Sequence, residues 1–251
     1  MMNDFFISSI KLNDAYINEI RKSYLKDVQS VRFLLEGNTL EFDNNVTFIV
    51  GENGSGKSTL LEAIAVAYGF NAEGGTMNMS FSTHSSHSDL YKYLKIGKRQ
   101  RAKDGFFLRA EGFYNVASYI DDLDNEFSFG PQLKSSYGGV SLHELSHGES
   151  FLAAIQNRFG RNGLYILDEP EAALSPMKLL TLLAEIKYLT DKNSQFIIST
   201  HSPILMAYPN AKIYEIKADG IFSVNYTDTE HYQITKSFLD NPERIFKYLF
   251  Q

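Results

Sequence analysis

The segment GENGSGKS at residues 51–58 constrains the fold of this 251-residue chain more than any other. It follows the continuous apolar run 46–50, which suits a strand buried on both faces of a parallel sheet. It leads into residues 57–68, where apolar side chains recur at helical spacing before Gly69 ends the pattern. A glycine-rich loop between a buried strand and a helix is the setting of a phosphate-binding loop, and it predicts an α/β fold.

The residue types of this loop explain how it would bind phosphates. Glycines let backbone N–H groups turn toward the phosphates, because a Cβ would obstruct that path. A lysine places a positive charge against the β and γ phosphates, a serine offers a hydroxyl to Mg²⁺, and the helix N-terminus adds partial positive charge. The residues expected to bind the nucleotide here are Gly51, Glu52, Asn53, Gly54, Ser55, Gly56, Lys57, Ser58 and Thr59.

Two carboxylates follow the apolar run of LYILDE at residues 164–169. Asp168 suits a Mg²⁺ contact, usually through water, together with Ser58. Glu169 then stands where it can orient or deprotonate an attacking water. A strand that ends in a polar turn is the simpler interpretation of either carboxylate alone. Their occurrence downstream of the phosphate-binding loop makes the magnesium and catalytic roles the better prediction.

The segment LSHGES at residues 145–150 predicts a helix start. Ser146 and Glu149 form a capping box, and the N-terminus of that helix can attract an anion. The same stretch also matches H-E-x-x-H from His143 to His147, a zinc-protease motif that needs both histidines inside one helix. Because the capping serine predicts that the helix begins within this stretch, we disfavour a metalloprotease.

Two further segments complete the pattern. EAALSP at residues 171–176 contains Ser175 before Pro176, which favours a helix N-cap and first turn. STHSP at residues 199–203 places His201 after an apolar strand; a lone histidine in that position is usually structural.

Taken in their order along the chain, with LSHGES before LYILDE, these segments resemble the ABC-type ATPases, whose two copies sandwich ATP between the loop of one and the signature of the other. The resemblance implies ATP and Mg²⁺ as cofactors. It implies an α/β, P-loop NTPase fold of ABC type, with a mainly parallel core sheet flanked by helices, N-terminal antiparallel strands and an inserted helical subdomain. We expect one domain spanning residues 1–251, with approximately 71–144 as the insertion.

The resemblance also assigns roles across the two copies. Ser146 and Gly148 match the Leu-Ser-x-Gly core of the signature, and Ser175 lies in the segment similar to the D-loop, so these three residues would contact ATP held by the other copy. His201 resembles the switch histidine that contacts the γ-phosphate. With Glu169 and Lys57 it makes up the expected catalytic set.

The chain departs from the transporter form of the family in its signature, and two other family features are not identifiable. His147 and Glu149 stand where that form has a glycine and often a glutamine. The family's Gln after a core strand and its adenine-stacking aromatic have no clear equivalents. The candidates for these two roles are Gln100, Gln132 and Glu111 for the first and Tyr24 and Phe33 for the second.

We therefore expect an ATPase that forms a head-to-tail homodimer when it binds ATP and is reset by hydrolysis. The departures favour coupling to DNA or to an effector protein over the alternative, the ATP-hydrolysing subunit of an ABC membrane transporter. A third hypothesis, an ATP sensor that does not hydrolyse, is disfavoured because both Asp168 and Glu169 are present.

Composition sets the remaining expectations. The net charge of −6 gives no global attraction to nucleic acid, although residues 91–103 hold six basic side chains and no acidic one, which leaves open either a solvated surface or a nucleic-acid contact. His84 and His87 lie in a Ser-rich loop that we interpret as polar rather than metal-binding. No cysteine, no signal-peptide pattern and no long apolar run occur, so we expect a cytoplasmic protein.

Overall fold

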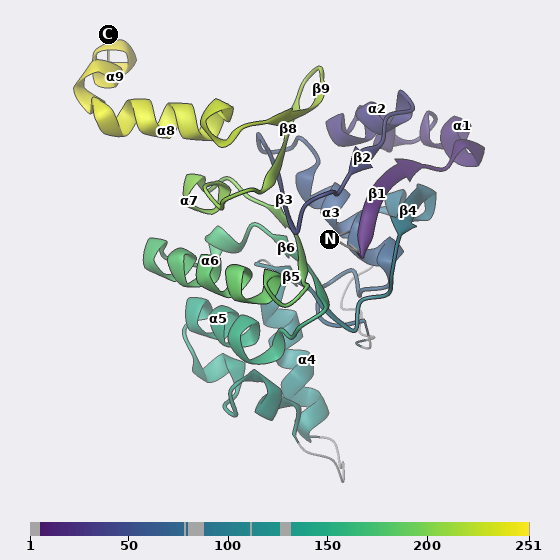
Figure 1. Ribbon diagram of the computed structural model, residues 1–251, viewed down its shortest axis with the longest axis vertical. Coiled ribbons are helices and arrows are strands. Elements are labelled where there is room, and N and C mark those ends of the chain that lie inside the picture. The colour runs from purple at the N-terminus through teal and green to yellow at the C-terminus, as the bar shows by residue number, and fades with distance from the viewer. Residues whose placement is uncertain (1–5, 78, 80–87, 111, 126–131, 251) are drawn as a thin grey trace.

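A six-stranded sheet forms the centre of the molecule, as a computed structural model describes it for residues 6–77, 79, 88–110, 112–125 and 132–250 (Figure 1). Its strand order is β5-β6-β7-β3-β8-β9. The first five strands in this order run parallel, and β9 pairs antiparallel with β8. The strands are β3 (Val46–Gly51), β5 (Asp104–Arg109), β6 (Gly163–Asp168), β7 (Gln195–Ser199), β8 (Lys212–Lys217) and β9 (Gly220–Val224).

Alternate side chains of these strands enter two separate cores, one on each face of the sheet. In β3, Phe48 belongs to one core and Ile49 to the other; in β7, Ile198 and Ile197 divide in the same way. Because side chains of a strand alternate between faces, a sheet covered on both sides requires apolar residues at nearly every position. This explains the continuous apolar runs in the sequence.

Helices cover both faces. The face that we call the α6 face carries α4 (Phe113–Asn125), α5 (His147–Arg158), α6 (Pro176–Thr190) and α7 (Pro203–Met206). The opposite face, the α3 face, carries α1 (Ile17–Ile20), α2 (Gln29–Leu35) and α3 (Lys57–Tyr68). A second, antiparallel sheet of order β2-β1-β4 also packs there, formed by β1 (Ile7–Leu12), β2 (Leu40–Glu41) and β4 (Leu94–Lys98). In Figure 1, α5, α6 and α7 lie to the left of the central strands, and α1, α2 and the second sheet lie to the right.

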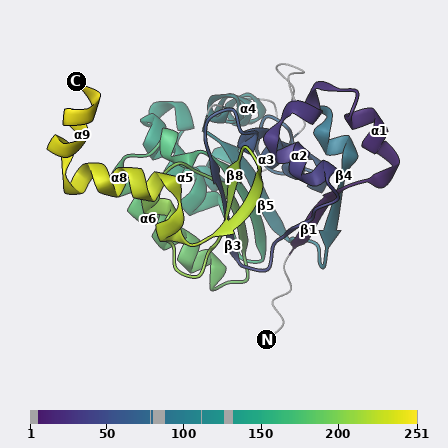
Figure 2. The same ribbon diagram turned by 90° about the horizontal axis from the view of Figure 1, so that it is seen from above.

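The chain ends in two helices that lie outside these layers. Helices α8 (Glu230–Asp240) and α9 (Pro242–Leu249) extend from the body in both views (Figures 1 and 2). We call residues 230–250 the C-terminal arm. Beyond its first turn nearly all of the arm is exposed, so it is attached to the body mainly at its beginning.

The predicted fold class is confirmed: the core sheet is mainly parallel, both faces carry helices, and the N-terminal strands β1 and β2 pair antiparallel. Within the range 71–144, β5 lies in the core sheet and β4 in the second sheet. We therefore retain the inserted helical subdomain as a proposal for the segment from α4 to the 3-10 turn Leu142–Glu144.

Candidate functional site

The phosphate-binding loop connects β3 to α3, as the sequence predicts. Gly56 has φ 92°, and a Cβ there would lie 2.3 Å from Cγ1 of Val28, so both the backbone conformation and the space require glycine. Gly54 has φ 81° and open space where a Cβ would point. The loop therefore keeps its backbone accessible on one side while it packs tightly against the protein on the other.

Lys57 begins α3 and is almost completely buried. Its Nζ atom donates hydrogen bonds of 3.0 Å to the carbonyl oxygens of Gly51 and Glu52. Burial lowers the pKa of Lys57, while the nearby carboxylates of Glu169 and Asp168 act in the opposite direction. The ammonium is thus held at the N-terminus of a twelve-residue helix, where the first backbone N–H groups also attract anions.

Asp168 ends β6, and its carboxylate lies near Lys57 and Ser58 at the start of α3. Its Oδ1 accepts a 2.6 Å hydrogen bond from the hydroxyl of Ser199, and its Oδ2 lies 3.6 Å from Nε of Arg109. Burial raises the pKa of Asp168, and hydrogen bonds from Ser199 and Ser58 oppose that rise. A carboxylate beside a serine hydroxyl is an all-oxygen donor set of the kind that Mg²⁺ prefers, so these residues fit a magnesium ion.

Glu169 follows in an uncommon backbone conformation. Its φ of 49° and ψ of 55° are left-handed, which costs a residue with a Cβ roughly 1–2 kcal/mol. This conformation aims the carboxylate at two groups: Oε1 lies 3.8 Å from Nζ of Lys57 and 3.2 Å from Nε2 of His201. Such a strained carboxylate between two nitrogen groups is typical of a functional site.

His201 follows β7 and contacts both the segment that follows β6 and helix α8. Its backbone N–H donates to the buried carboxylate of Glu171, and its Nδ1 lies 2.8 Å from Nε2 of His231 in α8. Burial lowers the pKa of His201, and the positive charge of Lys57 lowers it further. The imidazole is therefore neutral near pH 7.

The segment LSHGES forms a capped helix start on the α6 face. Ser146 is exposed, and both its backbone N–H and its hydroxyl donate to the carboxylate of Glu149. A Cβ on Gly148 would lie 2.7 Å from the carbonyl oxygen of Ala173, so the glycine allows α5 to pack closely against the chain that leads into α6.

The start of α6 continues this surface. Ser175 is exposed and caps α6 by accepting a hydrogen bond from the backbone N–H of Lys178. Met177 and Leu180 are 74% and 50% exposed, so two apolar side chains lie at the surface beside this cap. The Lys178 ammonium reaches the α5 N-terminus, where its charge helps lower the pKa of Glu149.

The expected site residues thus form two groups. Lys57, Ser58, Asp168, Glu169 and His201 converge at the carboxyl ends of the parallel strands, whereas Ser146, Gly148 and Ser175 form a second surface on the α6 face. The helix of the first group, α3, and that of the second, α5, pack on opposite faces of the sheet (Figure 1).

The zinc-protease hypothesis is wrong, because the two histidines do not share a helix. His143 lies in the turn Leu142–Glu144, and His147 begins α5 after an extended residue, Leu145. No group of three potential metal ligands occurs within the described parts of the chain.

Sequence reasoning missed four residues of the first group: Arg109, Glu171, Ser199 and His231. The register of the sheet aligns Arg109 with Asp168 and Asp168 with Ser199, in one row across β5, β6 and β7. A polar residue at the end of each apolar strand was the available signal for Arg109 and Ser199. No local pattern indicates His231.

The candidates for the missing family features stay unassigned. Glu111 lies outside the described residues, and so do His84 and His87 of the Ser-rich loop that we interpret as polar. Gln100 lies in the loop after β4, and Gln132 precedes the 3-10 turn Leu133–Tyr137. Of the two aromatic candidates, Phe33 is half-buried in α2, and Tyr24 is 64% exposed.

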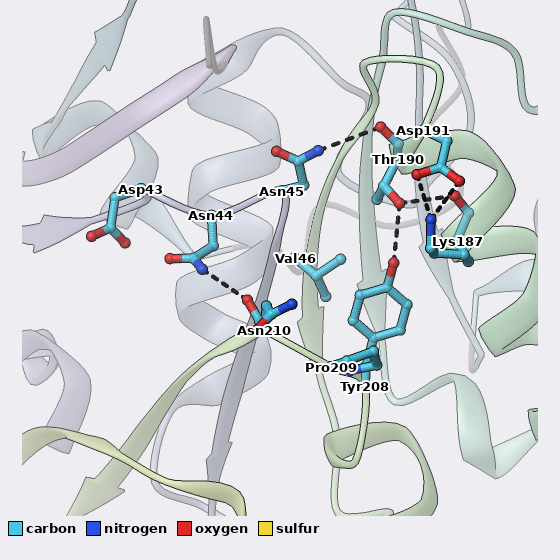
Figure 3. A pocket seen from close by; sticks show the side chains of 10 residues that line it. All are labelled: Asp43, Asn44, Asn45, Val46, Lys187, Thr190, Asp191, Tyr208, Pro209 and Asn210. Atoms are coloured by element: carbon cyan, nitrogen blue, oxygen red, sulfur yellow. Dashed lines mark hydrogen bonds and ion pairs between the residues drawn. The ribbon is translucent and has the colours of Figure 1, made fainter. Parts of the chain in front are cut away.

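A separate polar pocket lies near the amino end of β3 and the carboxyl end of α6 (Figure 3). Its volume is about 270 Å³. The Thr190 and Tyr208 hydroxyls lie 3.0 Å apart, and Asn44 donates to the carbonyl oxygen of Asn210. These groups satisfy one another, and the pocket lies at the opposite end of the strands from the phosphate-binding loop.

Comparisons with known proteins show which family the sequence resembles. The model of the RecF/RecN/SMC N-terminal domain family matches residues 24–221. An uncharacterized ABC transporter ATP-binding protein of Haemophilus influenzae is 25% identical over 242 residues, which cover 88% of this chain and 87% of the relative. The tungstate uptake system ATP-binding protein TupC of Campylobacter jejuni is 24% identical over 262 residues, covering 94% and 75%.

Among solved structures, cbiO1 from Clostridium perfringens, part of the ABC transporter complex cbiONQ, is 18% identical with a TM-score of 0.48. The match covers 85% of this chain and 91% of that one. Within the described residues of this chain, each helix is too short or too polar to cross a bilayer.

Proposed function

The chain belongs to the RecF/RecN/SMC N-terminal domain family and is an ABC-type ATPase, and from this premise we propose that two copies close head to tail around ATP and Mg²⁺ and hydrolyse the ATP between them. The observation that carries this proposal is the position of Glu169. Its carboxylate lies between the Lys57 ammonium and the His201 imidazole, at 3.8 and 3.2 Å.

One copy supplies the hydrolytic half of the proposed site. The loop N–H groups and Lys57 bind the phosphates, and Ser58 and Asp168 would hold Mg²⁺, which would supply positive charge to the reacting phosphates. Glu169 orients the water and takes its proton, and His201 donates to the γ-phosphate. The ammonium and the imidazole also fix the direction in which the Glu169 carboxylate points.

The second copy supplies the closing half. Ser146 and Gly148 at the α5 N-terminus and Ser175 at the α6 N-terminus would meet the γ-phosphate held by the first copy. Support comes from the exposure of Ser146 and Ser175 and from the unburied apolar side chains of Met177 and Leu180 beside them. Such a surface fits burial against another protein.

We propose a membrane transporter subunit as the coupled partner, with this chain acting at the cytoplasmic side of the membrane. This reverses the preference for DNA or an effector protein that the altered signature had suggested. Both curated relatives described above are named as ATP-binding proteins, one of an ABC transporter and one of an uptake system, and the chain covers most of each.

Coupling to nucleic acid is the second candidate, favoured by one surface. Lys98, Arg99 and Arg101 line a cavity of about 460 Å³ beside Tyr68. Clustered cations next to an aromatic ring can bind a phosphate backbone, although the net charge of −6 opposes long-range attraction.

The solution mass of Glu169→Gln with and without Mg·ATP tests the shared site. We expect a monomer that becomes a dimer with Mg·ATP, and slow phosphate release by the wild type. The double variant Lys57→Ala/Glu169→Gln should remain monomeric. A mass that does not respond to ATP would contradict the proposed dimer.

The partner is tested separately with the wild-type protein. Co-purification with an integral membrane protein supports the transporter, and stimulation of phosphate release by duplex DNA, lost on Arg99→Glu/Arg101→Glu substitution, supports nucleic acid. Neither result alters the test of the ATP site itself.

A further inference from the structure

The C-terminal arm reaches the candidate ATP site through one side chain, His231. Its Nε2 lies 2.8 Å from Nδ1 of His201, and the two rings are 4.9 Å apart. The first turn of α8 is also the anchored part of the arm: Thr229 is buried and caps the helix, and the backbone N–H of Glu230 donates to the buried Glu215 at 3.0 Å. The contact is therefore made by the firmly held end of the arm.

The environment of His201 decides which nitrogen carries the proton. If Nδ1 of His201 donated to His231, Nε2 would present a lone pair to Oε1 of Glu169 at 3.2 Å, which is repulsive. If His231 donates instead, His201 carries its proton on Nε2 and presents an N–H toward Glu169. Electrostatics thus favours His231 as the donor.

The buried ring atoms that lack a hydrogen-bond partner among the described residues are Nε2 of His201 and Nδ1 of His231. Each tautomer of the pair makes one of these two atoms an N–H donor, so their burial alone does not choose between the tautomers. With His231 as the donor, the N–H is that of His201, and it lies 3.2 Å from the carboxylate oxygen Oε1 of Glu169. The assignment therefore depends on the position of Glu169.

We propose that His231 is a positioning residue that holds His201 in the tautomer with its proton on Nε2, ready to donate to the γ-phosphate. This inference rests on the proposed function of His201. A hydrogen bond to one imidazole nitrogen determines whether the other nitrogen carries the proton. The C-terminal arm can therefore influence the ATP site through the contact between His231 and His201.

The charged groups around the pair do not change this assignment. Lys57 at the start of α3 repels a proton on His201, Glu169 at the end of β6 attracts one toward Nε2, and Glu171 is occupied by the backbone N–H of His201. A neutral imidazole with its proton on Nε2 adds no positive charge beside Lys57 and turns an N–H toward Glu169.

Steady-state phosphate release by a small set of variants tests the proposal. His231→Leu should lower kcat on the order of 10-fold and leave the KM for ATP within about twofold, as expected for loss of a supporting partner. His231→Gln should recover most of kcat, because the amide nitrogen can donate from the position of Nε2. In a His201→Ala background, His231→Leu should have no further effect, since the two residues act as one unit.

Tyr232→Ala serves as the matched control, because it loosens the same turn through the ring contact with Tyr226 and does not touch His201. An equal loss of kcat in Tyr232→Ala and His231→Leu would mean that His231 only anchors α8, and would overturn the inference. Two-bond ¹H–¹⁵N spectra of the imidazoles report the His201 tautomer directly. The Nε2–H form should dominate in the wild type and lose that dominance in His231→Leu.

The outcomes separate this inference from the proposed function. If His201→Ala slows hydrolysis and His231→Leu does not, the role of His231 is refuted while the ATPase site stands. If His201→Ala hydrolyses ATP as fast as the wild type, the role proposed for His201 fails, and the inference fails with it.

Discussion

The hydroxyl of Ser199 donates a 2.6 Å hydrogen bond to Oδ1 of Asp168 and accepts one of 3.1 Å from the backbone N–H of Glu169. One serine on β7 therefore holds both the carboxylate of Asp168 at the end of β6 and the backbone of Glu169, the residue that follows. The register of parallel strands places it there, opposite Asp168. A buried hydroxyl that orients a metal-binding carboxylate supports the metal site even though it does not touch the metal itself.

Ser199→Ala should weaken the magnesium dependence of the enzyme. We expect the Mg²⁺ concentration for half-maximal phosphate release to rise on the order of 10-fold, because Asp168 loses its orienting hydrogen bond. The free energy of unfolding should fall by about 1–3 kcal/mol, since a buried acceptor is left unsatisfied. Magnesium titration and urea unfolding measure the two effects.

Ser194→Ala is the control for this substitution. Ser194 is equally buried, next to the opposite end of β7, where it bonds the backbone of Gly163 and Gly160. The Ser194→Ala variant should have a lower free energy of unfolding than the wild type, with an unchanged Mg²⁺ concentration for half-maximal phosphate release. A shift of the same size in both variants would refute a specific role for Ser199.

Removal of Arg109 should leave the buried carboxylate of Glu62 without its ion-pair partner and should raise the pKa of Asp168. The guanidinium lies 2.7 Å from Oε2 of Glu62 and 3.6 Å from Oδ2 of Asp168. We expect Arg109→Met to lower the free energy of unfolding by about 1–3 kcal/mol, because Glu62 stays buried and unpaired. Since Arg109 opposes the rise in the pKa of Asp168, the acid limb of phosphate release should move to higher pH.

A double-mutant cycle isolates the Glu62 contribution. Arg109→Met/Glu62→Gln should recover part of the lost stability, because the uncompensated charge is gone, while the activity shift should persist. If the double variant is less stable than Arg109→Met by the full cost of Glu62→Gln alone, the two side chains are not coupled.

Glu149→Gln should strengthen ATP-driven dimerisation. The Glu149 carboxylate caps α5 at the position where the proposed dimer brings in a phosphate, and hydrogen bonds from Ser146 lower its pKa, so it is ionised. Glutamine keeps the capping box and removes the like charge. In the Glu169→Gln background we expect the dimer dissociation constant to fall about threefold or more, as for charges several ångströms apart in water.

Sedimentation velocity with Mg·ATP measures this change. Glu144→Gln removes the same charge from the preceding 3-10 turn and should leave the dissociation constant unaltered. An equal gain in both variants would indicate a general charge effect and not an effect at the signature.

Burial of Tyr137 should make the protein sensitive to alkali. Burial raises the pKa of Tyr137 to about 12, above the value of about 10 expected for an unfolded chain. Between these values the unfolded chain loses its proton first. The stabilising contribution is therefore complete below pH 10 and disappears as pH rises toward 12, by about 2–3 kcal/mol.

Urea unfolding at pH 9, 10 and 11.5 tests this dependence. Tyr137→Phe cannot ionise, so the stability difference from the wild type should narrow or reverse at the highest pH. Tyr248→Phe, whose parent side chain is 70% exposed, should follow the wild type throughout. A constant offset between Tyr137→Phe and the wild type would rule out the ionisation.

Local patterns were sufficient to predict most elements around the site. The buried run before Gly51, the helix from Lys57 and the capping box at Ser146 are all present. Each depends on residues within a few positions of one another, where strand burial, helix periodicity and capping act directly.

Contacts between distant segments were decided by the tertiary structure. The strand register aligns Arg109, Asp168 and Ser199, and the return of the chain after β9 brings His231 to His201. A shift of one residue in that register would turn these side chains to the opposite face, and nothing in the local sequence records which residue of one strand lies beside which residue of the next. The sequence by itself therefore determined the chemistry of the phosphate-binding loop and of the two carboxylates. The packing of the two cores against the sheet determined which side chains hold that loop and those carboxylates in place.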